Sequence, residues 1–249
     1  ATPAPPAGAP NILIIILDTV RAASLSLYGY PRPTTPALER WAARGVVFDR
    51  AHATAPWTLP SHVSMFTGLY HYQQPADWLT PLGPETRTLT PAFEARGYRT
   101  AGFVANAYYT SQETGLARGF GHFEAYARSP LQFLRSATLY QEMEGVSVGR
   151  FSRKRPYDRK RAAAVSAGFL DWLAESPADR PFFAFLNYFD AHTPRPRVPA
   201  GSPFAGNRPL VDNYDYQLAR LDAALDTLLT ALEARGELAR TLVVITSDH

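Results

Sequence analysis

Short apolar runs alternate along the chain with segments of helical periodicity. The first run, NILIIIL at Asn11–Leu17, is continuous and rich in β-branched residues, which predicts a central parallel strand buried on both faces. Similar runs predict further strands at Val46–Ala51, Thr100–Ala105, Pro181–Phe189 and Thr241–Thr246. The last of these is expected to be a buried strand of the same kind as the first.

Helical segments stand between these runs. Apolar positions at helical spacing, with Gly or Pro near the ends, predict helices at Thr35–Arg44, Pro60–Leu69, Thr90–Arg96, Lys160–Leu173 and Tyr214–Arg235. Strands that alternate with helices are typical of layered α/β proteins. The pattern therefore predicts an α/β fold with a mostly parallel central sheet and helices on both faces.

The pattern also suggests how the chain is divided. Residues 1–10, ATPAPPAGAP, predict an unpacked Pro/Ala linker, and residues 11–249 predict one α/β catalytic domain. Residues 106–156 are irregular and are expected to form an inserted loop region over one edge of the sheet. Because the chain stops at TLVVITSDH, directly after a predicted buried strand, we expect further C-terminal sequence to complete the fold.

Composition narrows the function only slightly. A net charge of +3 does not predict nucleic-acid binding, although it is compatible with anionic substrates. The sequence has no cysteine, which excludes disulfides and thiolate metal sites. No apolar run approaches the roughly 18 residues that span a bilayer. The chain begins at Ala1 and not at Met, so we expect an extracytoplasmic protein that is periplasmic, secreted or anchored to a membrane through a segment that is missing here.

Candidate metal ligands stand at the ends of two predicted strands. Asp18 directly follows the first strand, and Asp248 and His249 follow the last. Sites in parallel sheets lie beyond the carboxyl ends of the strands. Two carboxylates and one imidazole at the same edge would suit a divalent cation. Each residue alone is also compatible with a turn or a helix N-cap.

A candidate nucleophile, Thr58, lies in the segment APWTLPSHVSMFTG, just before a predicted helix. Free amide groups at a helix N-terminus favour a bound anion. A cation at the hydroxyl would turn this weak nucleophile into a stronger one. Thr58 could equally be a capping residue, together with Ser61 and Ser64.

These segments, taken in order, resemble the sulfatase family. The resemblance is carried by NILIIILDTVR, by the stretch from YGYPRPTTP to WTLPSHVSMFTG, by FLNYFDAHTP and by TLVVITSDH. It implies an alkaline phosphatase-like fold, with Asp18, Asp248 and His249 as metal ligands. It also places Thr58 at the nucleophile position of the C/S-x-P-S-R motif, which reads T-L-P-S-H in this chain.

Three departures from the family pattern change the expected chemistry. Sulfatases convert Cys or Ser to formylglycine, but the methyl group on the β-carbon of Thr58 prevents this, so no formylglycine is expected. His62 stands where the motif has Arg, and Thr19 where many sulfatases have a second Asp. A threonine nucleophile resembles nucleotide phosphodiesterases, phosphoethanolamine transferases and lipoteichoic acid synthases. That resemblance implies one divalent ion held by Asp18, Thr58, Asp248 and His249, with Zn²⁺ or Mn²⁺ favoured over Ca²⁺.

Other residues are candidates for substrate contact. His192, in DAHTP at a strand end, could hold a phosphate oxygen or protonate the leaving group, with Asp190 orienting it. Arg21, Asn106 and Tyr108 could line the pocket, and His62 takes the place of the motif arginine. Each is also compatible with a turn or a surface ion pair.

One further stretch is basic. The run from Arg150 to Arg161 holds seven Lys or Arg residues, and a solvated face is favoured there over contact with a lipid headgroup.

These observations lead to a metal-dependent hydrolase that cleaves phosphate or sulfate esters through Thr58. Two alternatives remain open. One is a transferase of lipid-headgroup phosphates, which differs from a hydrolase only in its acceptor. The other is a binding protein on the same scaffold that has lost catalysis. The small-molecule or lipid-headgroup substrate itself is not determined by the sequence.

Overall fold

A five-stranded parallel sheet forms the centre of the protein in the computed structural model, which describes all residues except 1–2, 79, 126–159 and 178. The strands lie in the order β3-β2-β4-β1-β5 and all their pairings are parallel. Their bounds are β1 Asn11–Leu17, β2 Arg99–Val104, β3 His122–Glu124, β4 Phe182–Tyr188 and β5 Thr241–Thr246. The predicted mostly parallel sheet is confirmed.

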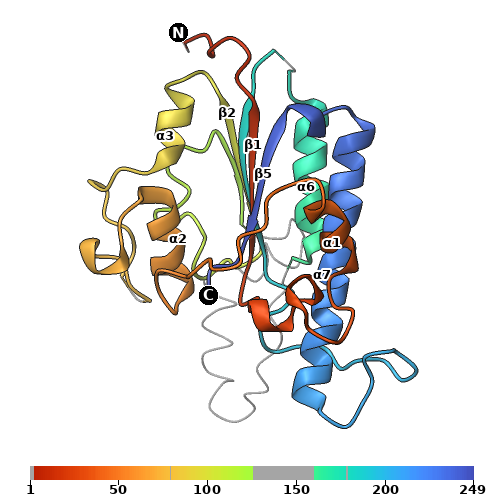
Figure 1. Ribbon diagram of the computed structural model, residues 1–249. Helices are drawn as coiled ribbons and strands as arrows, with labels where there is room; N and C mark the ends of the chain where they lie inside the picture. The colour runs from red at the N-terminus through yellow and green to blue at the C-terminus, as the bar shows by residue number, and fades with distance from the viewer. Residues whose placement is uncertain (1–2, 79, 126–159, 178) are drawn as a thin grey trace, which may run out of the picture.

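Helices cover both faces of this sheet, as predicted. Helices α2 and α3 lie on one face, and α1, α6 and α7 lie on the other (Figure 1). Their bounds are α1 Pro36–Ala42, α2 Thr58–Thr67, α3 Leu89–Glu94, α6 Ala162–Glu175 and α7 Pro209–Ala234. Short 3-10 turns lie at Ala22–Ser24, Ser26–Tyr28, His71–Gln73 and Leu238–Arg240. Among the residues that the structure describes, no helix has both the length and the apolar character needed to cross a bilayer.

The two central strands supply a separate core to each layer of helices. Side chains alternate between the faces of a strand, so consecutive apolar residues are buried on opposite sides. Leu13 and Ile15 of β1 and Leu186 of β4 pack towards α6 and α7. Ile16 of β1 and Phe185 of β4 pack in the core of α2 and α3. The continuous apolar runs therefore follow from burial on both faces.

Strand register brings the ends of β1, β4 and β5 to one edge. Ile16 stands opposite Asn187 on β4 and opposite Thr246 on β5. The residues that follow β1 and β5 in the sequence thus emerge side by side. The C-terminus of the chain lies at this edge, whereas the N-terminus lies at the opposite end of the strands (Figure 1).

Polar contacts fix α7 and α1 against the segment that leaves β1. Arg32 forms ion pairs with Asp212 at 2.8 Å and Asp215 at 2.7 Å, both on α7. The carboxylate of Asp222 accepts hydrogen bonds from the amides of Ala37 and Leu38, each at 2.8 Å. These are free amides of the first turn of α1, and a carboxylate stabilises such a helix terminus.

The prediction of a strand at Val46–Ala51 is wrong. These residues form an irregular segment that connects α1 to α2, and the exposed fraction is 80% for Val46 and 70% for Phe48. Apolar runs of this length are ambiguous, because periodicity alone does not tell whether the segment has a partner strand.

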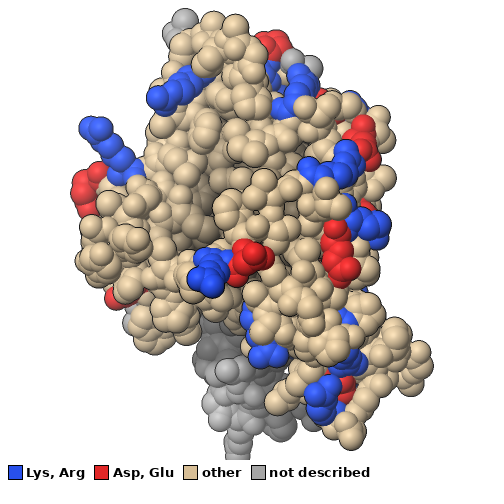
Figure 2. Space-filling view, viewed as in Figure 1, with Lys and Arg blue, Asp and Glu red and all other residues tan. Residues whose placement is uncertain are grey.

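The strand β5 also differs from its prediction, because it lies at the edge of the described sheet. Its residues alternate in burial, and Leu242 and Val244 are exposed. On the molecular face that carries β5, few charged side chains lie between α3 and α7 (Figure 2). β5 is therefore an edge strand with one apolar face open, and not a strand buried on both faces like β1.

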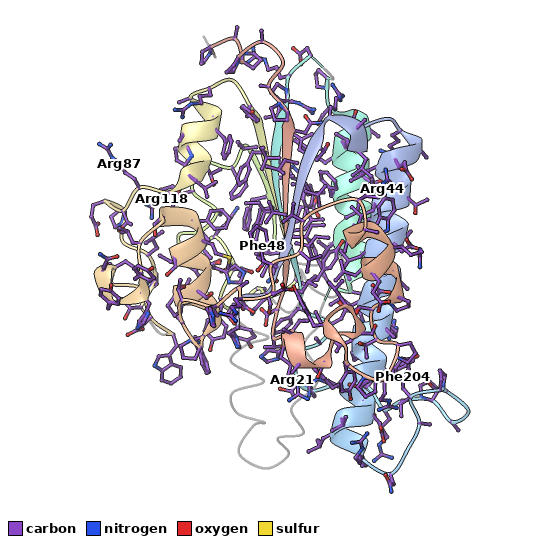
Figure 3. The ribbon with its side chains drawn as sticks, viewed as in Figure 1. Arg21, Arg44, Phe48, Arg87, Arg118 and Phe204 are labelled. Carbon is purple, nitrogen blue, oxygen red and sulfur yellow. The ribbon has the colours of Figure 1, made fainter. Side chains whose placement is uncertain are left out.

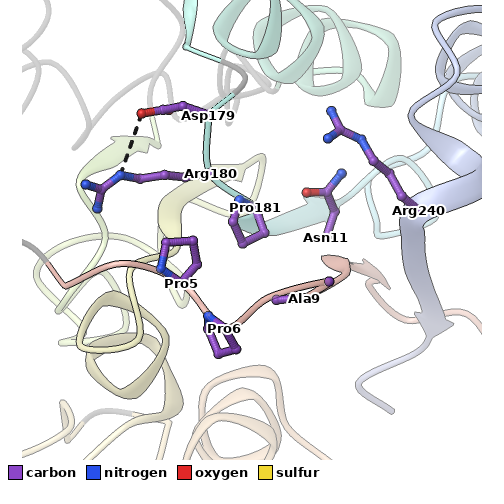
Figure 4. Close-up of a pocket in the computed structure, with 9 residues that line it drawn as sticks. Pro5, Pro6, Ala9, Asn11, Asp179, Arg180, Pro181 and Arg240 are labelled. Atoms are coloured by element: carbon purple, nitrogen blue, oxygen red, sulfur yellow. Dashed lines mark ion pairs between the residues drawn. The ribbon is translucent and has the colours of Figure 1, made fainter.

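Two further segments refine the predicted organisation. Residues 3–10 lie against the amino ends of the strands, where the guanidinium of Arg180 donates to the carbonyl of Pro3 at 3.2 Å. A pocket between this segment, Arg180 and Arg240 lies at the end of the sheet remote from Asp18 (Figure 4). The loop predicted at 106–156 contains β3, which sequence reasoning missed. The part of this loop after residue 125 and most of the basic run from Arg150 to Arg161 lie outside the described residues.

Truncating a fully buried leucine should cost far more stability than truncating an exposed one on the same sheet. Leu186→Ala removes a core side chain with no exposed area, and should lower the free energy of unfolding by about 2–5 kcal/mol. Leu242→Ala is the matched control, and should change it by no more than about 0.5 kcal/mol. Urea unfolding measures both, and equal losses would contradict the observed layering.

Candidate active site

Three candidate metal ligands meet beyond the carboxyl ends of β1 and β5. Asp18 follows β1, and Asp248 and His249 follow β5. Each offers a ligand atom, and these atoms all lie within 4.8 Å of one another. Asp18 and Asp248 have no exposed area, whereas His249 is partly exposed. The spacing of the three ligand atoms suits a single cation, and the partly exposed His249 leaves the site open to solvent.

The carboxylate of Asp248 is oriented by the backbone around it. Its Oδ1 atom accepts hydrogen bonds from the amide of Thr19 at 3.0 Å and from the amide of His249 at 2.9 Å. Within the described part of the chain, its buried Oδ2 atom accepts no hydrogen bond. A buried carboxylate oxygen without a hydrogen bond destabilises the folded state unless a cation faces it.

The turn after β1 is held in an unusual conformation that supports this arrangement. Thr19 has a φ of 59°, which costs a β-branched residue roughly 1–3 kcal/mol. Its amide binds Asp248, and its carbonyl accepts a hydrogen bond from the hydroxyl of Tyr214 at 2.8 Å. The amide of Val20 donates to the hydroxyl of Ser247 at 3.1 Å. The two strand ends are therefore joined directly.

Thr58 is the first residue of α2, because this helix begins two residues earlier than the sequence predicts. Its Oγ1 atom lies 3.4 Å from Nε2 of His249. The hydroxyl of Ser61, on the same helix, donates to the carbonyl of Asp248 at 2.7 Å. The helix N-terminus is thus tied to the end of β5, and its dipole and free amides favour negative charge at that point.

A buried polar network lies behind these groups. Nδ2 of Asn106 donates to Oδ2 of Asp18 at 2.9 Å, and its backbone amide donates to Oδ1 of Asn187 at 3.0 Å. Asn106, which was expected to line the pocket, contacts a candidate metal ligand. Asn187 was not recognised from the sequence, although a polar residue inside the apolar run FFAFLNYF is a signal that could have identified it.

The imidazole of His62 completes this network and has no exposed area. Burial lowers the pKa of His62 below its ordinary value, although the nearby Asp248 opposes this shift. In the neutral ring, Nδ1 donates to the carbonyl of Thr58 at 2.8 Å, and Nε2 faces the amide nitrogen of Asn187 at 3.4 Å. The structure thus gives His62 a role in holding α2, where the sequence predicted substrate contact.

Two other residues predicted to contact substrate, Arg21 and His192, have partners of their own near the strand ends. Arg21 lies at the same end of the sheet, beyond the end of β1 (Figure 3). Its Nε atom donates to Ser24 at 2.7 Å, and its guanidinium lies 5.7 Å from the ring centre of Tyr214. His192 stacks on Phe189 at 4.3 Å between ring centres, and its Nδ1 atom lies 2.6 Å from the carbonyl of Thr193. Substrate contact by either residue stays a prediction.

The donor set fits a divalent cation. Carboxylate oxygens, an imidazole nitrogen and a hydroxyl are ligands of Zn²⁺ and Mn²⁺, whereas Ca²⁺ usually takes six to eight oxygens. The unbonded Oδ2 atom of Asp248 points to the same conclusion. Asp18, Thr58, Asp248 and His249 would hold the ion.

Comparison with known proteins agrees with this geometry. The model of the Sulfatase family matches residues 10–249. The chain belongs to this family. It is 28% identical over 270 residues to human arylsulfatase A, a match that covers 96% of this chain and 52% of that protein. The chain spans about half the length of the curated relatives that it matches.

Solved structures with the same fold include several other proteins. The phosphonate monoester hydrolase of Agrobacterium radiobacter has a TM-score of 0.69 at 21% identity, over 96% of this chain and 62% of that one. The C-terminal periplasmic domain of EcEptC from Escherichia coli, solved in complex with Zn, has a TM-score of 0.67 at 17% identity. That match covers 97% of this chain and 64% of the other. These likenesses confirm the alkaline phosphatase-like fold of the family.

Removing the His62 ring should destabilise the protein. His62→Ala leaves the Thr58 carbonyl and the Asn187 amide without their partner and opens a cavity, so the free energy of unfolding should fall by about 2–4 kcal/mol. His52→Ala, at an exposed position before α2, is the control and should stay within about 0.5 kcal/mol of wild type. Denaturant unfolding followed by circular dichroism gives both values, and a tolerated His62→Ala would refute the anchoring role.

Proposed function

We propose that this chain carries the nucleophile and the metal site of a metal-dependent hydrolase that cleaves phosphate or sulfate esters. The observation that carries the proposal is the position of the Thr58 hydroxyl, 3.4 Å from the imidazole of His249, which is grouped with Asp18 and Asp248. The membership of the Sulfatase family supports an ester hydrolase.

In this proposal, Thr58 Oγ attacks the phosphorus or sulfur atom in line with the leaving oxygen. A cation held by Asp18, Asp248 and His249 would favour the alkoxide of Thr58 and neutralise charge on the transferred group. Thr58 loses its hydroxyl proton to solvent, and its oxygen forms the new bond of a phospho- or sulfo-threonine. The bond to the leaving oxygen breaks, and that oxygen takes a proton to become an alcohol. Water then cleaves this ester, which regenerates Thr58. His192 is proposed to donate the proton to the leaving group.

The α2 N-terminus supports the same chemistry. The amides of its first turn have no partner within the helix, so they would donate to oxygens of the transferred group. Asn106 and the backbone of Thr19 hold the two carboxylates in place, which keeps the ligand geometry fixed during the reaction.

Transfer to an acceptor alcohol is the second candidate. Threonine at the nucleophile position favours it, because Thr58 cannot form the formylglycine of sulfatases. The similarity to the EcEptC domain, which was solved in complex with Zn, supports zinc at the site. That neighbour is a periplasmic domain, which supports an extracytoplasmic location for this chain as well. A lipid-headgroup ester is the substrate expected of such a transferase, with the membrane nearby.

Replacing the nucleophile should abolish turnover and leave the fold intact. Thr58→Ala should lower kcat by about 10³-fold or more, because no oxygen remains to attack. Most of the metal binding should be retained, because Asp18, Asp248 and His249 remain. Release of p-nitrophenol from p-nitrophenyl phosphate, bis-p-nitrophenyl phosphate and p-nitrophenyl sulfate measures activity. Thr67→Ala, at the other end of the same helix, is the control and should keep full activity.

The outcomes of this experiment separate the candidates. Full activity in Thr58→Ala would exclude this residue as the nucleophile. A wild-type protein that binds metal but turns over none of the three esters would favour a binding protein instead. Activity that rises with added glycerol would favour the transferase over the hydrolase.

A further inference from the structure

An aromatic cluster stands beside the candidate nucleophile. It consists of Trp57, Trp78 and Tyr109, which come from three separate segments of the chain. The ring of Trp57 lies 5.7 Å from that of Trp78 and 5.8 Å from that of Tyr109, between ring centres. The interplanar angles are 74° and 83°, so both contacts are edge-to-face. Such contacts favour a defined arrangement of the rings.

The cluster is continuous with the site. Trp57 directly precedes Thr58, and its carbonyl accepts a hydrogen bond from the amide of Ser61 at 3.1 Å. The amide of Tyr109 donates to Oδ1 of Asn106 at 3.3 Å, and the side chain of Asn106 donates in turn to Asp18. Trp57 and Tyr109 are therefore both attached to residues that carry the proposed chemistry, and Trp78 joins the cluster through Trp57.

The indole side chains of Trp57 and Trp78 are not part of the hydrophobic core. Trp57 has an exposed fraction of 41% and Trp78 of 54%. Large apolar side chains that stay exposed next to a polar site are typical of surfaces that bind a ligand. Edge-to-face contact within the cluster leaves ring faces available for stacking, and a flat apolar ring face is the complementary ligand surface.

We propose that Trp57, Trp78 and Tyr109 form a subsite for the leaving group of the substrate, and that this leaving group is a ring. The inference rests on the proposed function, because the phosphate or sulfate would lie at Thr58. A ring attached to the transferred group stacks its apolar face on the exposed indoles. Esters of a sugar or aryl alcohol fit this subsite, and esters of a short linear alcohol gain nothing from it.

The test compares cyclic with acyclic esters on variants of the cluster. The cyclic esters are p-nitrophenyl phosphate, for an aryl ring, and glucose 6-phosphate, for a sugar ring, whereas ethyl phosphate is acyclic. Trp57→Ala and Trp78→Ala should each raise KM for at least one cyclic ester by about tenfold, with kcat within about threefold of wild type. KM for ethyl phosphate should stay within about twofold. Trp57→Phe should recover most of the loss.

Trp41→Ala is the matched control, because Trp41 lies on α1, against the opposite face of the sheet. It should leave KM for every ester unchanged. An equal rise of KM for cyclic and acyclic esters in Trp57→Ala would reject the subsite in favour of a structural role. Phosphoethanolamine, assayed beside these esters, tests a cationic leaving group. A rise of KM for phosphoethanolamine alone would reject the ring and favour a cation–π contact.

A binding measurement distinguishes a failure of the proposed subsite from a failure of the proposed function. Glucose 6-phosphate and phenyl phosphate should quench the tryptophan fluorescence of Thr58→Ala protein, and Trp57→Ala should weaken that binding about tenfold. If wild type turns over no ester but this quenching is seen, the subsite stands and the hydrolase proposal fails. If esters are hydrolysed but Trp57→Ala binds them with unchanged affinity, the subsite is refuted.

Discussion

The burial of two carboxylates at one edge of the sheet is the constraint on which the site depends. β1 and β5 are neighbours, so Asp18 and Asp248 leave them at the same edge, without exposed area, and with ligand atoms within 4.8 Å of each other and of His249. Like charges that close repel each other in a medium of low dielectric, and burial adds a cost of desolvation. A divalent cation removes both costs at once.

The surrounding fold keeps this arrangement in place. The backbone of the Thr19 turn binds Oδ1 of Asp248, and a buried network of His62, Asn187 and Asn106 runs from the Thr58 carbonyl to Asp18. Because these links cross from α2 to β4 and on to β1, movement of the helix would disturb the nucleophile and a metal ligand together. The two apolar layers provide the rigidity that such a polar network requires.

The parts of the fold that depend on local pattern could be predicted from the sequence. NILIIIL and FFAFLNY are almost entirely apolar because both faces of β1 and β4 are covered, and Asp18 and Asp248 were recognised as strand-end residues. The incorrect predictions concern which segments pair with one another, and not which segments are apolar. The run at Val46 has no partner strand, and β5 lies at an edge, facts that periodicity does not encode. The burial of His62 was likewise not predicted, because it depends on packing between α2 and β4.

Melting temperature as a function of divalent cation tests the central claim most directly. Metal-free protein should melt at a lower temperature than protein with saturating Zn²⁺ or Mn²⁺, by on the order of 5 °C or more, since binding to the folded state alone stabilises it. Asp248→Asn removes one of the two charges, so it should lose this response while the metal-free variant melts no lower than metal-free wild type. A wild-type melting temperature unchanged by Zn²⁺, Mn²⁺ and Ca²⁺ would contradict the account.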